Sequence, residues 1–458
     1  MGILNNIKKY NSLKNTDNEN IKLKLMASHP FIFLRGTVEI FFKELSKPEY
    51  QNSILFDNSL SCWCANDIHI TNFGFSNISC STNKEVHYQI NDFDEAFLGN
   101  PFNDIIRLCS SLYYFIEEAN IEISKKNKNL FKNYNPEDFI NIFIEEYKKT
   151  IKNPKRYRKM LKEEFPFMYS KQMEAKEKSI STNKNSRFSK YVEKNKNGFI
   201  LNKKNKKLKE IPLEKRIKII KDLKKIYPNN EILDLKERKV AGVGSSHLER
   251  YYFIMKKEGE YLLMELKEQI QPVSTLYIKK DTKEYETKYK DRPIADIQIK
   301  AINKMIGKKY DENLSSLYIN GKSFISRTSF NAKLKVSIEE LTSEDLEITK
   351  SNIKEYIKLA AIKIGKVHVR SAKEKYLFQE KIINLIEKDS ELLKGMIKRV
   401  YNEIEMSYSS FLREYYLTLG NEISKEDFEE IMKNTFLIIN EQSGKLKKEI
   451  SKTKNKEG

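Results

Sequence analysis

The spacing of apolar and polar positions predicts a chain that combines helices with short strands. Between residues 20 and 46, apolar side chains recur at intervals of three and four, which is the period of an amphipathic helix. Apolar runs at 61–64 and 85–90, with Asn and Ser between them, predict two strands. A second helical pattern extends from 103 to 119. Residues 1–120 are therefore expected to form one mixed part of a larger fold.

The character of the sequence changes several times after residue 120. Residues 121–235 are expected to be helical and increasingly basic, with an insertion at about 171–209 that is mobile or weakly packed. Residues 236–335 are rich in strand patterns, and residues 336–442 return to long amphipathic helices. The tail at 443–458 is basic and polar, so we expect it to fray.

The strand-rich part has the clearest local signals. Apolar runs at 251–255, 261–266 and 323–328 predict strands. The charged residues around a glycine at 256–260 are typical of a hairpin tip. An amphipathic helix is expected near 294–306. Helices and antiparallel strands in separate stretches of one chain indicate an α+β fold class.

The formal charge of +20 has two interpretations. A basic surface would suit an anionic partner such as nucleic acid or a phosphorylated substrate. We favour a compositional explanation, because the lysines are spread along the chain and mixed with 64 acidic residues. No apolar run reaches the length of a membrane span, and the first residues lack the apolar core of a signal peptide. We therefore expect a cytoplasmic protein.

The four cysteines are Cys62, Cys64, Cys80 and Cys109. They are too few for a disulfide framework in a chain of 458 residues. Cys62 and Cys64 could bind zinc together with a nearby histidine, but their spacing matches no familiar ligand pattern. We expect buried free thiols in a reducing cytoplasm.

A set of acidic and amide residues follows the first two predicted strands. Asp67 and Asn72 lie on the loop after the first strand, and Asp92 and Asp94 follow the second. Kinase-type phosphoryl transfer needs one carboxylate near the acceptor hydroxyl, and an Asn and an Asp for Mg²⁺. We predict that Asp67 orients or deprotonates the acceptor. Asn72 and Asp92 would hold the metal, with Asp94 as a further ligand. Because Asp and Asn are common in loops, this set alone leaves a structural role open.

A second set lies in the strand-rich part. Gly242, Gly244 and Ser245 form a glycine turn whose backbone N–H groups could approach phosphates. Lys267 ends an apolar strand that follows, where it could pair with the same phosphates. Asp296 on the next helix could hold Lys267 as an ion pair, although it could equally be an ordinary exposed acid. A glycine turn followed by a strand lysine predicts a nucleotide-binding lobe.

Seven segments together form a specific set of motifs: Met26–Gly36, Asn66–Gly74, Ile90–Ala96, Gly99–Leu108, Lys239–Ser245, Leu266–Glu268 and Gly365–Ser371. The set resembles the bacterial family catalogued as domain of unknown function 2252, and the likeness covers most of the chain outside the insertion and the tail. That family is similar to protein-kinase-like and aminoglycoside-phosphotransferase-like enzymes. The resemblance therefore implies ATP and Mg²⁺ as cofactors.

The resemblance also implies an unusual chain order. Asp104 corresponds to the Asp that supports the catalytic loop from the next helix. Ile364–His368 corresponds to the end of the helix that normally leads into that loop, although here it comes long after it. We expect a protein-kinase-like two-lobe fold, circularly permuted, with residues 1–120 and 336–442 in the catalytic lobe and residues 236–335 in the nucleotide lobe.

Some residues depart from the family pattern or support the site. Asn66 stands where the family usually has Gly, and His247 stands where a third loop Gly is expected. Asp296 stands where we expect Glu. We expect His69 to order the loop through hydrogen bonds rather than to touch substrate. Arg107 is expected to pair with a nearby carboxylate.

The sequence therefore predicts an ATP- and Mg²⁺-dependent kinase-like phosphotransferase that acts on a hydroxyl of a small molecule or a protein. Nucleotidyl transfer is a variant of the same prediction. One alternative is a nucleotide-binding pseudokinase that serves as an interaction module. The other is a basic nucleic-acid-binding protein in which the same residues are structural.

Overall fold

The computed structural model describes most of the chain, in two compact units. The described residues are 2–10, 17–57, 59–77, 86–126, 134–155, 162–178, 187–196, 198–239, 248–307, 310–329 and 334–419. Unit 1 comprises Met1–Glu44, Gly242–His247 and Lys398–Gly458, and unit 2 comprises Leu45–Ala241 and Leu248–Ile397. Each unit is described by itself below.

Unit 1 is helical in its described part. Its helices are α1 (Ile3–Tyr10), α2 (Asp17–Ser28), α3 (Pro30–Gly36), α4 (Val38–Leu45) and the second half of α17 (Ser390–Leu419). The carboxylate of Glu414 accepts hydrogen bonds from the backbone N–H groups of Ile3 and Leu4 at 3.0 and 2.9 Å. The Phe33 ring packs against Tyr408 at 5.3 Å. These contacts hold the first helices against α17.

The helical prediction for residues 20–46 is confirmed, and the structure divides this region into three helices, α2, α3 and α4. His29 has an extended backbone, and its ring nitrogen Nδ1 accepts a hydrogen bond from the N–H of Phe31 at 3.1 Å. Pro30 has no N–H to continue the ladder of α2, but it suits the first position of a new helix. Thr37 separates α3 from α4 with a non-helical backbone.

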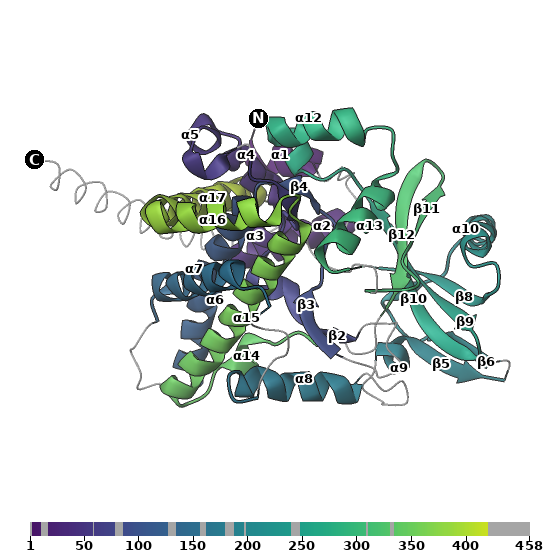
Figure 1. Cartoon of the computed structure of the whole chain (residues 1–458). Coiled ribbons are helices and arrows are strands. Elements are labelled where there is room, and N and C mark those ends of the chain that lie inside the picture. The colour runs from purple at the N-terminus through teal and green to yellow at the C-terminus, as the bar shows by residue number, and fades with distance from the viewer. Residues whose placement is uncertain are drawn as a thin grey trace, which may run out of the picture. The chain divides into compact units, whose positions relative to one another are not determined.

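Unit 2 is built on one large antiparallel sheet (Figure 1). Its strand order is β11-β12-β10-β9-β8-β7. The strands are β7 (Leu208–Lys209), β8 (Glu231–Arg238), β9 (Arg250–Lys257), β10 (Glu260–Gln269), β11 (Ser315–Ile319) and β12 (Lys322–Thr328). Glu258 and Gly259 have φ angles of 50° and 84°, which a tight hairpin turn requires. The predicted strands and hairpin tip are therefore confirmed.

Side chains alternate between the two faces along β9 and β10 of this sheet. Phe253 and Leu266 point to the face that helix α10 (Leu213–Ile226) covers with Leu223. Tyr252 and Leu263 point to the other face. The period of two along each strand therefore separates a closed hydrophobic core from the face that also carries Lys267. Figure 1 shows α10 on the outer side of the sheet.

The other face of the sheet corrects our prediction of residues 121–235. That region contains helices, but also the strands β5 (Val192–Asn195) and β6 (Gly198–Leu201) beside helix α9 (Arg187–Tyr191). Phe188 and Tyr191 are buried against Tyr252 of the sheet. Four residues of the expected weakly packed insertion thus belong to the core: Phe188, Tyr191, Val192 and Leu201. Their aromatic rings pack inside the protein, which removes them as surface groups for nucleic acid.

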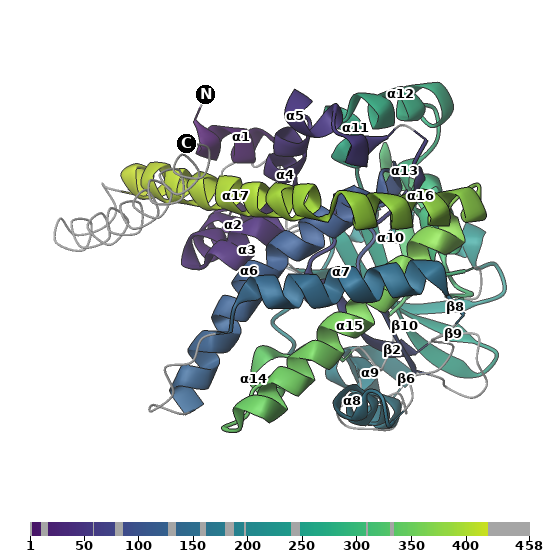
Figure 2. The ribbon, with the colours of Figure 1, turned by 60° about the vertical axis from the view of Figure 1, so that its left-hand side comes forward.

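Helices and short strands complete unit 2. They are α5 (Pro48–Gln51), β1 (Cys62–Cys64), β2 (Phe73–Asn77), β3 (Val86–Ile90), β4 (Phe97–Gly99), α6 (Pro101–Lys126), α7 (Pro136–Lys152), α8 (Pro166–Lys178), α11 (Ser274–Tyr277), α12 (Lys279–Lys288), α13 (Ile294–Met305), α14 (Ile338–Leu341), α15 (Leu346–Ser371) and α16 (Lys375–Lys388). Strand β1 pairs with β4, and β2 pairs with β3. Helix α7 lies across α15 (Figure 2).

The combination of helices with antiparallel sheets confirms the α+β class. The predicted strands at 61–64 and 85–90 and the predicted helices at 103–119 and 294–306 are present, and the first of these helices continues to Lys126. None of the described helices has the length and apolar character that a membrane crossing needs.

The sheet core gives a first test. Leu266 is fully buried between the sheet and α10. We expect Leu266→Ala to lower the free energy of unfolding by about 2–5 kcal/mol, because it removes buried methyl groups and leaves a cavity. Leu276→Ala makes the same change at a side chain that is 52% exposed, and should change it by less than about 0.5 kcal/mol. Chemical denaturation measures both. Equal losses would contradict this packing.

Candidate active site

The loop that carries Asp67 is held by a buried carboxylate. Strand β1 ends at Cys64, and the backbone N–H groups of Ala65 and Asn66 donate to the two oxygens of Asp104 at 2.9 and 2.7 Å. Asp104 lies in the first turn of α6 and is fully buried. Hydrogen bonds from backbone N–H groups to a buried carboxylate are strong, so this contact fixes the start of the loop.

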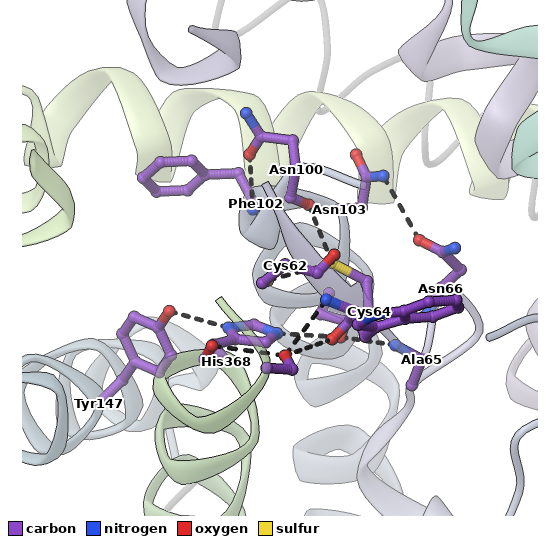
Figure 3. A network of polar contacts seen from close by, with 12 residues as sticks. Cys62, Cys64, Ala65, Asn66, Asn100, Phe102, Asn103, Tyr147 and His368 are labelled. Atoms are coloured by element: carbon purple, nitrogen blue, oxygen red, sulfur yellow. Dashed lines mark hydrogen bonds and ion pairs between the residues drawn. The ribbon is translucent and has the colours of Figure 1, made fainter. Parts of the chain in front are cut away.

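The buried histidine His368 is paired with Asp104, and Figure 3 shows its ring beside Tyr147. His368, near the end of α15, has its Nε2 3.1 Å from a carboxylate oxygen of Asp104 and its Nδ1 2.9 Å from the hydroxyl of Tyr147. Burial alone would lower the pKa of His368, but the hydrogen bonds to Asp104 and Cys64 raise it to about 9. The imidazolium therefore balances the Asp104 charge in a dry environment.

Asn66 bends the backbone of the loop. Its φ angle of 62° lies in the left-handed region, which Gly and Asn tolerate better than other residues. Its side-chain nitrogen donates to the backbone oxygen of Glu95 at 3.1 Å, and lies 3.4 Å from the hydroxyl of Ser274. Asn in place of the usual Gly therefore keeps the backbone conformation and adds bonds to two other segments.

Asp67 is paired with Arg107, as we expected for the arginine. The Nε and one terminal nitrogen of Arg107 donate to the same Asp67 oxygen at 3.1 and 2.7 Å. Arg107 is fully buried, whereas the Asp67 side chain is 23% exposed. The buried fork fixes the direction of a carboxylate that is still open to solvent, which is a suitable arrangement for orienting an acceptor hydroxyl.

One face of α6 holds the whole loop. Asp104 binds its first N–H groups, Arg107 binds Asp67, and the hydroxyl of Ser111 accepts a hydrogen bond from the N–H of Ile70 at 2.9 Å. These three helix residues lie at positions i, i+3 and i+7, so they share one side of the helix. Ser111 was not among the predicted site residues, although its spacing from Asp104 places it on the same side of α6.

Asn72 and His69 stabilise the loop in different ways. The side-chain nitrogen of Asn72 donates to the backbone oxygen of Asp67 at 3.0 Å. This bond uses the amide nitrogen, and the amide oxygen is the atom that binds hard cations. His69 is buried, and its Nδ1 lies 2.9 Å from the hydroxyl of Thr71. The structure thus shows His69 in a hydrogen bond within the loop.

The pairing of β2 with β3 brings Asn72 close to the Asp92 segment. Phe73 pairs with Ile90, and just beyond this pair the N–H of Asn91 donates to the oxygen of Asn72 at 2.9 Å. Asn72 and Asp92 therefore leave the same end of a two-stranded ribbon.

Lys267 joins this group from the large sheet. Its ammonium group forms an ion pair with Asp94 and lies 3.6 Å from an Asp92 oxygen. Lys267 is only 2% exposed, whereas the Asp92 side chain is 46% exposed. Burial raises the pKa of Asp94, the Asp92 carboxylate raises it further, and Lys267 opposes both effects. Two acids that face one lysine form a site suited to a cation.

The expected ion pair between Asp296 and Lys267 is absent, which is a correction. Asp296 is exposed on α13 and accepts a hydrogen bond from the hydroxyl of Ser316. The other face of α13 points to the site, where buried Gln298 donates to the backbone oxygen of Asp94. Asp94 is the residue that holds Lys267. Gln298 points to the site and Asp296 points away from it, because two positions along an α-helix rotate the side chain by about 200°.

The predicted glycine turn with Gly242, Gly244 and Ser245 lies outside the described residues, as does His247. In chain order it falls between β8 and β9. Its phosphate-binding role stays a prediction.

The cysteines lie behind the loop. Cys62, Cys64 and Cys109 are buried free thiols, as expected, and Cys80 lies outside the described residues. The Cys62 and Cys64 sulfurs are 3.6 Å apart, and with His368 they could form a three-ligand metal group. Both ring nitrogens of that histidine already have partners, so the group fits a packed core better than a metal site.

The comparison with protein families gives one clear result. A family described as uncharacterised proteins conserved in bacteria, domain of unknown function 2252, matches residues 16–414. The chain belongs to this family. The family predicted from the motifs is thereby confirmed. No curated protein and no solved structure matches the chain.

The bent loop of this family member gives a second test. We expect Asn66→Ala to be less stable than Asn66→Gly by about 1 kcal/mol, because the left-handed backbone is strained for Ala and not for Gly. Both variants lose the same side-chain bonds, so each is the control for the other. Thermal or urea unfolding measures the difference. Equal stability, or a more stable Ala variant, would show that the positive φ is not required.

The buried His368 gives a pH test. Its folded pKa of about 9 lies above its ordinary value of 6.5, so its contribution is complete below about pH 6.5 and is lost as the pH rises through 9. The shift corresponds to roughly 3 kcal/mol. We expect the stability difference between the natural protein and His368→Gln to shrink by that amount between pH 6 and 10. A difference independent of pH would contradict the charged pair.

Proposed function

We propose that this protein is an ATP- and Mg²⁺-dependent phosphotransferase with a two-lobe, kinase-like fold in circularly permuted order. The single observation that carries the proposal is the position of the Lys267 ammonium, beside Asp94 and 3.6 Å from Asp92. These residues come from segments far apart in the chain. A nucleotide triphosphate in a kinase site must reach a strand lysine and a metal-binding Asp at once.

The topology around Lys267 supports a nucleotide lobe. Lys267 lies on β10, the third strand of the consecutive β8-β9-β10 meander, and the glycine turn falls between the first two of these strands in the sequence. Helix α13 follows β10 before β11 and β12 complete the sheet. Kinases carry a glycine-rich loop, a lysine on their third strand and a following helix in the same order. Here Asp94 takes the place of a helix carboxylate as partner of the lysine.

Contacts at the end of α15 support the permuted order. The hydroxyl of Ser371, the last residue of α15, accepts a hydrogen bond from the N–H of Trp63 at 3.1 Å. Three residues earlier, His368 binds Asp104 behind the catalytic loop. The end of α15 thus lies beside the start of the strand that enters the loop. Joining the two would restore the order in which a kinase-like chain reaches this loop.

The donor set fits magnesium. Asn72 offers an amide oxygen, and Asp92 and Asp94 offer carboxylates, which are the hard oxygen ligands that Mg²⁺ takes together with phosphates. Bound magnesium would offset the charge on the transferring phosphate oxygens. Burial and the Asp92 carboxylate raise the pKa of Asp94, and a bound cation would offset this repulsion as the Lys267 ammonium does.

The chain's own residues have separate tasks in this proposal. Asp67, held by Arg107, orients the acceptor hydroxyl and is placed to take its proton. Lys267 holds the phosphates as a point charge. Asp104 and His368 position the loop from behind and touch no ligand.

Nucleotide binding and turnover can be separated by two variants. We expect Mg-ATP to raise the melting temperature of the natural protein, and Lys267→Ala to remove most of that rise. Asp67→Ala should keep the rise but lower the Mg-dependent release of phosphate from ATP by about 10²-fold or more, because it removes only the orienting carboxylate. Thermal shift and phosphate release measure the two effects.

Asp296→Asn is the matched control, since it changes a carboxylate that points away from the site, and it should behave as the natural protein does. Mg-ATP binding without phosphate release, by the natural protein as well as by the variants, would favour a pseudokinase. Tight, salt-sensitive binding of nucleic acid with no effect of nucleotide would overturn the proposal in favour of a nucleic-acid-binding protein.

A further inference from the structure

A small pocket lies next to the proposed metal site. Among the residues that line it are Asn91, which precedes Asp92, and Glu265, which lies two positions before Lys267 on the same face of β10. Arg327 of β12 lies directly opposite Glu265, and Arg187 of α9 lines the pocket as well. The inference below rests on the proposed function, because it concerns a molecule bound beside Asp92 and Lys267.

Two arginines, Arg187 and Arg327, and one glutamate, Glu265, are the charged residues that line the pocket. Glu265 pairs with Arg327 at 2.7 Å and with Arg250 at 3.3 Å. Arg187 is near enough to interact with the same carboxylate. Three guanidinium groups therefore interact with Glu265, and both hydrogen bonds from Arg327 go to one of its two oxygens. Two arginines and one glutamate leave the pocket lining with a net positive charge, which favours an anion.

The pocket also presents donors that other groups do not use. The Nε of Arg187 donates to the hydroxyl of Ser329 at 2.7 Å, and one of its terminal nitrogens donates to the hydroxyl of Tyr252. The Nε and one terminal nitrogen of Arg327 bind Glu265. The other terminal nitrogen, Nη1, of each arginine has no hydrogen bond to the described part of the chain.

Asn91 adds an independent observation. Its side chain is 9% exposed, and its amide nitrogen is buried without a hydrogen-bond partner among the described residues. An unsatisfied buried N–H donor costs about 1–3 kcal/mol, and an acceptor on a bound molecule would remove that cost. The donor of Asn91 and the two arginine donors line the same pocket.

We propose that this pocket is an anion subsite that binds a phosphate-like oxyanion of the molecule held beside Asp92 and Lys267. Two guanidinium groups and an amide N–H together suit the several acceptor oxygens of such a group. The oxyanion has two possible sources, a phosphate of the nucleotide or an anionic group of the acceptor. In either case the subsite sets the position of that molecule relative to the metal ligands.

Inorganic phosphate binding to the full chain, measured by calorimetry without nucleotide or Mg²⁺, tests the subsite. We expect Arg187→Gln to weaken phosphate binding about tenfold, because it removes a charged donor. Asn91→Asp replaces the donor with an anion and should abolish binding. Arg292→Gln removes the charge of an exposed arginine and should have no effect. The melting temperature of each variant without ligand shows that it is folded.

Asp67→Ala should bind phosphate as the natural protein does, so a failed transfer reaction and a failed subsite give different results. Phosphate that competes with Mg-ATP would assign the subsite to the nucleotide. Phosphate that binds together with Mg-ATP would assign it to the acceptor. No phosphate binding by the natural protein, or equal binding by Asn91→Asp, would overturn the inference.

Discussion

The contact of Lys267 with Asp92 and Asp94 is the constraint on which the site depends. A buried ammonium group is stable only beside acidic partners, so the sheet strand and the Asp92 segment must meet. Asp94 in turn depends on Lys267, because burial and the nearby Asp92 raise the pKa of Asp94 and the lysine opposes both effects. Segments that are distant in the chain are therefore held together by charges that neither segment can bury alone.

A second buried polar group fixes the other half of the site. Asp104 binds the backbone of the loop, and His368 balances its charge from behind. Arg107 on the same helix fixes the direction of Asp67. Because these side chains are buried and hydrogen-bonded, they position an exposed carboxylate without touching it. Rigid support of this kind is what catalysis by positioning requires.

The sequence predicted the parts of the structure that local signals determine. The alternation along β10 and the turn at Gly259 gave the hairpin and the position of Lys267. The partner of Lys267 was predicted wrongly, because the choice between Asp94 and Asp296 depends on which face of α13 packs inward. That choice is made by tertiary contacts, which no local pattern contains.

Two details of the structure were not predicted: the burial of Phe188 and Tyr191, and the division of the helical region 20–46 into three helices. Phe188 and Tyr191 lie among lysines, so their burial against the sheet was hidden by the basic composition around them. In the early segment the apolar period continued across Pro30, although the cap at His29 starts a new helix there. Phe188 and Tyr191 are buried because the large sheet packs against them. At Pro30 the missing backbone N–H ends one helix and begins another, although the apolar period continues.

A crystal structure of the protein with Mg²⁺ and a non-hydrolysable ATP analogue tests the central claim most directly. The account predicts that the phosphates lie against Lys267 and that the metal ion is bound by Asp92 and Asn72, with Asp67 facing the terminal phosphate. An analogue bound elsewhere, or phosphates that touch neither Lys267 nor a metal at Asp92, would contradict it.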